Sequence, residues 1–131
     1  MAAARPPANQ PRPKYLDLVR IRLPVPGFVS ILHRVSGAAL FLFLPVGLCL
    51  LQSSLASPEG FDRVRVLVTH QLAKLATLGL AWAFLHHFFA GLRFLALDLH
   101  YGTELAAARA TSWLVLGASL ALTLIVAAWL W

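Results

Sequence analysis

The stretch Trp113–Trp131, WLVLGASLALTLIVAAWLW, contains 19 consecutive residues without a charge and has a tryptophan at each end. About 20 apolar residues cross a bilayer as an α-helix, and tryptophan is enriched at both membrane surfaces. A strand is disfavoured because an unpaired sheet edge finds no hydrogen-bond partner in lipid. This stretch therefore predicts a membrane-spanning helix.

Two stretches further upstream have the same apolar character, and each is long enough to cross a bilayer. We expect helices over residues 27–51, 66–97 and 111–131, joined by short loops. The prediction is an all-α integral membrane protein with three transmembrane helices.

The composition supports this class. Of the 131 residues, 60% are hydrophobic and 12% are charged, whereas an ordinary soluble domain has about 25% charged residues. This deficit excludes a free-standing soluble globule and a disordered chain. The single cysteine, Cys49, excludes an internal disulfide, an iron–sulfur cluster held by thiolates and a CxxCH haem attachment site.

Positive charge is concentrated at the start of the chain. The net charge is +6, and residues 1–34 hold six of the basic residues against one acid, Asp17. Because apolar sequence follows immediately, the positive-inside rule explains this bias better than nucleic-acid binding does. We expect residues 1–26 to be a basic, proline-rich cytoplasmic segment, retained rather than cleaved as a signal peptide, before a transmembrane domain over 27–131.

The first apolar stretch carries polar side chains on one face. Ser30, His33, Arg34 and Gly37 fall within about a 100° arc of a helix. Ionisable residues inside a membrane span are costly and usually functional. A hydroxyl, an imidazole and a guanidinium can bind a quinone oxygen or a haem propionate. The alternative is an arginine that extends to the membrane surface beside a serine at a helix start.

The second apolar stretch carries two adjacent histidines. Gly79, Ala83, His87 and Gly91 are spaced by four, which predicts a groove of small residues with one imidazole in it. Such a groove suits a flat macrocycle ligated by His87, although close helix packing produces the same pattern. His86 points about 100° away and is the weaker candidate ligand.

Counting residues from the predicted helix ends gives a depth for each histidine. His33 is expected roughly 9 Å from the cytoplasmic end of its helix, and His87 roughly 15–18 Å from the cytoplasmic end of the next. Two histidines on one iron place their nitrogens only about 4 Å apart. We therefore expect that His33 and His87 do not share an iron. If His87 binds haem in a site with two histidine ligands, the second ligand comes from another chain.

Three segments resemble the cytochrome b subunit of bacterial succinate dehydrogenase, respiratory complex II. They are Arg12–Leu18 (RPKYLDL), Ser30–Gly37 (SILHRVSG), and His87–Arg93 (HFFAGLR) followed by Asp98. The second is specific over its whole length, and the third is less so. One position departs from the pattern, since Phe94 stands where the family often has a histidine.

The resemblance implies a membrane-anchor and electron-transfer subunit of succinate:ubiquinone oxidoreductase in the bacterial inner membrane. It implies one haem b with His87 as an axial ligand, ubiquinone contacts from Ser30 and Arg34, and propionate contacts from His33 and Arg34. The implied partners are a second small anchor that supplies the other haem ligand, an iron–sulfur subunit and a flavoprotein, and no nucleic acid. Succinate oxidation would reside on those partners, because the chain has neither a nucleotide-binding loop nor cluster cysteines. The alternatives are a fumarate reductase anchor and a small membrane protein without redox function.

Overall fold

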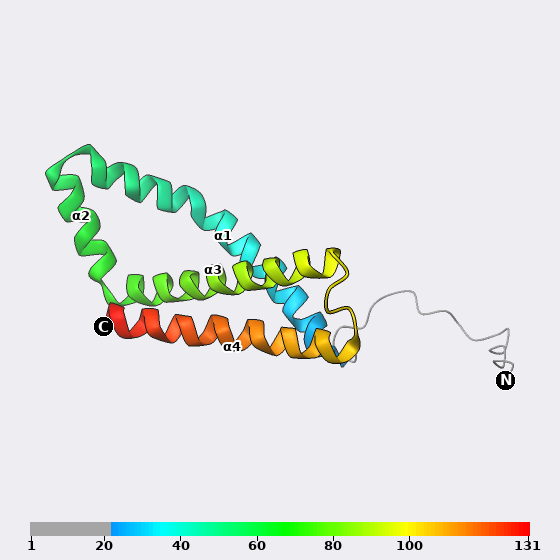
Figure 1. Cartoon of the computed structure of the whole chain (residues 1–131). Helices are drawn as coiled ribbons and strands as arrows, with labels where there is room; N and C mark the ends of the chain where they lie inside the picture. Colours follow the sequence, from blue (N-terminus) through cyan, green and yellow to red (C-terminus); the bar gives the residue numbers. More distant parts are fainter. Residues whose placement is uncertain (1–21) are drawn as a thin grey trace, which may run out of the picture.

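The computed structural model describes residues 22–131, and this part of the chain is helical without a strand. Three of its helices are long and apolar enough to cross a membrane, which confirms the all-α prediction with three spans. Figure 1 shows the helices in chain order: α1 (Val25–Ala56), α2 (Pro58–Thr69), α3 (Gln71–Asp98) and α4 (Leu105–Leu130).

The three long helices differ in how much of their length packs against a neighbour. Helices α3 and α4 lie side by side and antiparallel, whereas α1 crosses α3 in the first half of α1 and then diverges (Figure 1). The second half of α1 therefore presents apolar side chains outward, such as Phe41 (75% exposed) and Leu55 (78% exposed). Lipid or another protein must cover this half in a membrane.

Helix α2 occupies a region that was expected to be a loop between two spans. Ser57 is its N-cap, with a hydroxyl that accepts a hydrogen bond from the backbone N–H of Gly60 at 3.0 Å. Pro58 suits the first helical position because its missing N–H would have no partner there, and Glu59 favours the positive end of the helix dipole. In Figure 1, α2 bridges the gap between the far end of α1 and the start of α3.

The second span begins at Gln71, five residues later than the predicted start at 66, because His70 interrupts the helix. Its backbone is extended (φ −67°, ψ 141°), and its Nδ1 accepts a hydrogen bond from a backbone N–H in the first turn of α3. The third span begins at Leu105, earlier than the predicted 111. Its approach contains His100 and Gly102 at φ 64° and 74°, left-handed conformations that reverse the chain.

Small residues bring α3 and α4 together. Each helix buries one face at spacings of three and four, and small side chains there let two membrane helices approach closely. The hydroxyls on α4 are satisfied within their own helix by carbonyl oxygens one turn earlier. The buried residues of these faces are Ala83, His86, Ala90 and Arg93 on α3, and Ser112, Val115, Ser119 and Thr123 on α4.

Candidate functional site

The crossing of α1 and α3 brings two histidines into contact. The rings of His33 and His87 stack with centroids 4.2 Å apart and planes 16° apart. The expected difference in depth between them is therefore wrong. Residue counts from the predicted helix ends fail here because α1 begins at Val25, two residues before the predicted start, and crosses α3 obliquely (Figure 1).

The stacked rings do not have the geometry of two ligands on one iron. Axial ligands direct their nitrogens at opposite sides of a metal, whereas these rings present their faces to one another. Phe94 extends the cluster, with its ring 5.2 Å from that of His33. An aromatic ring thus lies at the position where the related pattern often has a histidine.

Hydrogen bonds determine which nitrogen of His87 carries the proton. Its Nδ1 lies 3.0 Å from the backbone oxygen of His33, and a carbonyl oxygen can only accept. Nδ1 must therefore be the donor, and in the neutral imidazole Nε2 then keeps its lone pair. An imidazole oriented through Nδ1–H to a backbone carbonyl is the usual arrangement of a metal-binding histidine.

Ser36 completes this contact and was not among the candidate residues. Its hydroxyl donates to the backbone oxygen of His33 at 2.9 Å, and its oxygen lies 3.4 Å from Nδ1 of His87. Ser36 is almost fully buried. The signal that could have found it is its position three residues after His33, which places both on one side of a helix.

Glycines lie opposite both histidines, but only one of them is needed for the close approach. A Cβ at Gly37 on α1 would lie 2.7 Å from Cε1 of His87 on α3, closer than side chains pack. A Cβ at Gly91 on α3 would lie 3.7 Å from Nε2 of His33 on α1, which is an ordinary contact. Gly79, which the spacing placed in the same groove, has no such neighbour within 4 Å. The close approach of the two helices at His87 therefore depends on the absence of a side chain at residue 37.

His86 lies in a different environment from its neighbour. It is completely buried and stacks on Trp82 with ring centroids 5.3 Å apart, and within residues 22–131 neither ring nitrogen has a hydrogen-bond partner. His87 is only partly buried. Of the two, only His87 therefore keeps surface at the exterior of the described helices.

Ser30 and Arg34 lie one turn apart on α1, near the crossing. Ser30 is half-buried and Arg34 is exposed. Their four-residue spacing places them along one side of the helix. The structure therefore leaves the guanidinium of Arg34 accessible, while the ring of His33 turns towards α3.

Arg93 lies near the end of α3, where an arginine commonly extends to the membrane surface. The structure instead buries the Arg93 side chain between α3 and α4. Its Nε donates to the hydroxyl of Thr111 at 3.1 Å, and its Nη2 donates to the backbone oxygen of Ala108 at 3.3 Å. Arg93 thus connects the end of α3 to the start of α4.

Within residues 22–131, no group of three or more histidine, cysteine, aspartate or glutamate side chains could hold a metal ion. Among the described residues, His87 has an Nδ1 that is held by a backbone carbonyl, the arrangement that orients the other ring nitrogen of a metal-binding histidine.

The sequence was compared with known proteins. Residues 8–126 match the family model described as succinate dehydrogenase/fumarate reductase transmembrane subunit. A succinate dehydrogenase cytochrome b556 subunit of Coxiella burnetii is 36% identical over 124 residues, which cover 94% of this chain and 99% of that protein. A protein of the same name from Paracoccus denitrificans is 30% identical over 117 residues, which cover 89% of this chain and 88% of that protein.

Proposed function

The chain belongs to the succinate dehydrogenase/fumarate reductase transmembrane subunit family, and we propose that it anchors a succinate:ubiquinone oxidoreductase in the bacterial inner membrane. In this role it contributes to the binding of one haem b and to the ubiquinone-reduction site. The two relatives carry succinate dehydrogenase in their names, which favours this direction over fumarate reduction.

The observation that carries the haem assignment is the hydrogen bond from Nδ1 of His87 to the backbone oxygen of His33. It leaves Nε2 free to bind iron and fixes the ring plane, and the contact with Gly37 limits rotation. The cytochrome b556 names of the relatives support a b-type haem. Haem supplies a one-electron carrier whose potential depends on its axial ligands and on hydrogen bonds around it.

Two residues are assigned to the quinone. The exposed guanidinium of Arg34 offsets negative charge that develops on a quinone oxygen, and Ser30 can donate a hydrogen bond one turn away. Arg34 and His33 are adjacent in sequence, so the guanidinium can contribute charge and the imidazole a hydrogen bond near haem propionates. Arg34 is thus the residue that both assignments share.

The partners follow from the incomplete site and the exposed surface. The stacked rings of His33 and His87 are not arranged to bind one iron together, so the second haem ligand is assigned to a second anchor subunit. The diverging half of α1 offers apolar area for it. Because the chain has one cysteine, the clusters and the flavin are assigned to an iron–sulfur subunit and a flavoprotein that oxidises succinate.

The test is an optical difference spectrum of the complex purified through this chain in mild detergent, before and after addition of succinate. The wild-type complex is expected to show a b-type band that develops with succinate. His87→Ala is expected to remove or loosen the haem, while His86→Ala, at the buried neighbouring position, keeps it.

The outcomes distinguish His87 from His86 as the haem ligand and test the proposed function. Unchanged haem in His87→Ala together with loss in His86→Ala moves the ligand to His86. A wild-type complex without haem and without a co-purified flavoprotein contradicts the proposal as a whole. Haem that only dithionite reduces contradicts electron delivery from succinate.

A further inference from the structure

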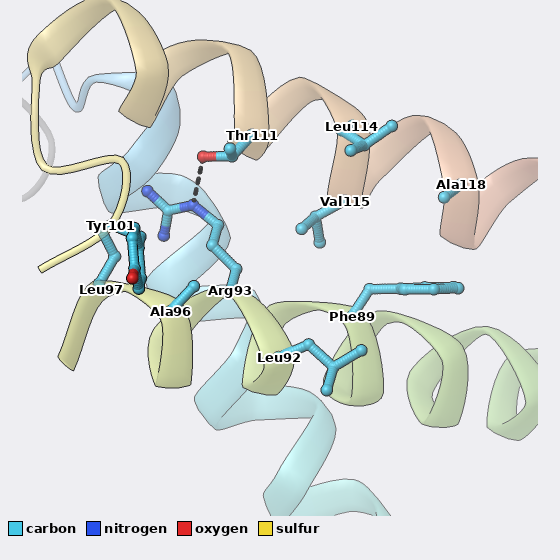
Figure 2. Close-up of a pocket in the computed structure, with 10 residues that line it drawn as sticks. All are labelled: Phe89, Leu92, Arg93, Ala96, Leu97, Tyr101, Thr111, Leu114, Val115 and Ala118. Carbon is cyan, nitrogen blue, oxygen red and sulfur yellow. Dashed lines mark hydrogen bonds between the residues drawn. The ribbon is translucent and has the colours of Figure 1, made fainter. Parts of the chain in front are cut away.

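A cavity of about 380 Å³ lies between α3 and α4. Its volume falls within the range of about 300–1,000 Å³ that is usual for small-molecule sites. Figure 2 shows that Arg93 enters it from α3 and that its guanidinium turns towards Thr111 on α4. His87, in contrast, faces α1, so the cavity and the histidine pair lie on different sides of α3.

The cavity contains a buried positive charge whose partners are neutral. Arg93 is 8% exposed, and within residues 22–131 its hydrogen bonds go to a hydroxyl and to a backbone carbonyl. These bonds use two of the five N–H donors of a guanidinium. Burial of a charge is expensive unless an opposite charge compensates it. The cavity therefore favours a ligand with a negative charge.

The remainder of the cavity is apolar, and the polar and apolar ends lie at different positions along α3 and α4. Its polar end, with Arg93 and Thr111, lies close to the connection between α3 and α4, where Tyr101 is also found (Figure 2). Its other end runs along the two helices past Phe89 and Ala118. Since both spans terminate at this connection, the polar end lies near a membrane surface and the apolar end points into the bilayer.

We propose that this cavity binds an anionic membrane phospholipid of the phosphatidylglycerol type. The phosphate accepts hydrogen bonds from the free guanidinium donors of Arg93, a pairing in which arginine is especially effective. One acyl chain lies against the apolar walls formed by Phe89 and Val115. A phosphatidylcholine binds less well because its choline already neutralises the phosphate.

The complex that contains this chain is placed in nanodiscs with equal amounts of phosphatidylglycerol and phosphatidylcholine, then extracted in mild detergent, and its retained lipids are quantified by mass spectrometry. The wild-type complex is expected to retain phosphatidylglycerol in preference to phosphatidylcholine. Arg93→Gln is expected to reduce this retention about tenfold, because a hydrogen bond to a charged group is lost. Arg109→Gln, an exposed arginine near the start of α4, is the matched control and leaves retention unchanged.

A second variant keeps the positive charge of Arg93 and reduces the volume of the cavity. Ala118→Phe fills the apolar part of the cavity and is expected to release the phospholipid while Arg93 remains. This variant still tests the proposed lipid site if the Arg93→Gln complex does not assemble. Equal retention of the two lipids by the wild type overturns the proposal. So does unchanged phosphatidylglycerol retention in both cavity variants, or retention of a free fatty acid or inorganic phosphate in its place.

Discussion

Gly37→Ala tests whether the contact between α1 and His87 positions the imidazole. A Cβ at residue 37 would lie 2.7 Å from Cε1 and 3.1 Å from Nδ1 of His87, whereas ordinary contact begins at 3.4 Å. The ring must therefore retreat by about 0.7 Å, the difference between 3.4 and 2.7 Å. If the ring moves away along the line of the hydrogen bond to the His33 oxygen, the distance from Nδ1 to that oxygen grows from 3.0 Å to about 3.7 Å, which is beyond hydrogen-bonding range.

The expected result is weaker haem binding without unfolding. Loss of the partner that orients a metal-binding histidine typically lowers metal affinity about 10–100-fold. The helix itself gains, because alanine is favoured over glycine inside a helix by about 1 kcal/mol. We therefore expect Gly37→Ala to lower the haem-to-protein ratio and alter the b-type spectrum, while the thermal midpoint of the haem-free protein stays the same or rises.

Gly47→Ala is the matched control. Gly47 lies on the same helix and has no atom within 4 Å of an added Cβ, so its substitution brings the same helix propensity without the contact. Haem content in this variant should equal that of the wild type. If Gly37→Ala also keeps its haem affinity and spectrum, the inferred dependence of His87 on its distance from α1 is refuted.

Three further substitutions test other contacts. Ser36→Ala removes the 3.4 Å contact to His87 and the 2.9 Å hydrogen bond to the His33 oxygen, but it leaves the bond from Nδ1 of His87 in place, so we expect retained haem with at most a few-fold loss of affinity in a haem titration. Gly60→Ala places a Cβ against a backbone carbonyl of α1 and should lower stability by about 1–3 kcal/mol in detergent unfolding, whereas Gly117→Ala meets nothing and should not. Arg34→Leu should reduce succinate-driven quinone reduction about a hundredfold while dye-linked succinate oxidation persists; unchanged quinone reduction would remove Arg34 from the site.

The three spans were predictable because charge-free apolar runs leave a chain few alternatives in lipid. Helix α2 was missed, although its start carried the relevant signals. Ser57, Pro58 and Glu59 form an N-cap, a first-turn proline and an acid at the positive end of a helix. Hydropathy alone predicts a loop at these residues, because it does not detect a short polar helix.

The contacts around His87 could be predicted only in part. The small residues near the histidines indicated a close approach, and Gly37 and Gly91 take part in it. The partner of each glycine depends on where α1 crosses α3, and residue spacing within one helix carries no information about that crossing. The stacking of His33 on His87, and the burial of Ser36 beside them, required the relative placement of two helices.

The divergence of α1 links this packing to the proposed role. Near its start, α1 is held against α3 by the histidine pair, and that contact orients His87 through a backbone oxygen that side-chain substitution cannot remove. Further along, α1 leaves α3 and exposes large apolar side chains such as Phe41. If a second subunit shares the cofactor, as proposed above, it meets on this chain both an oriented imidazole and an uncovered apolar face.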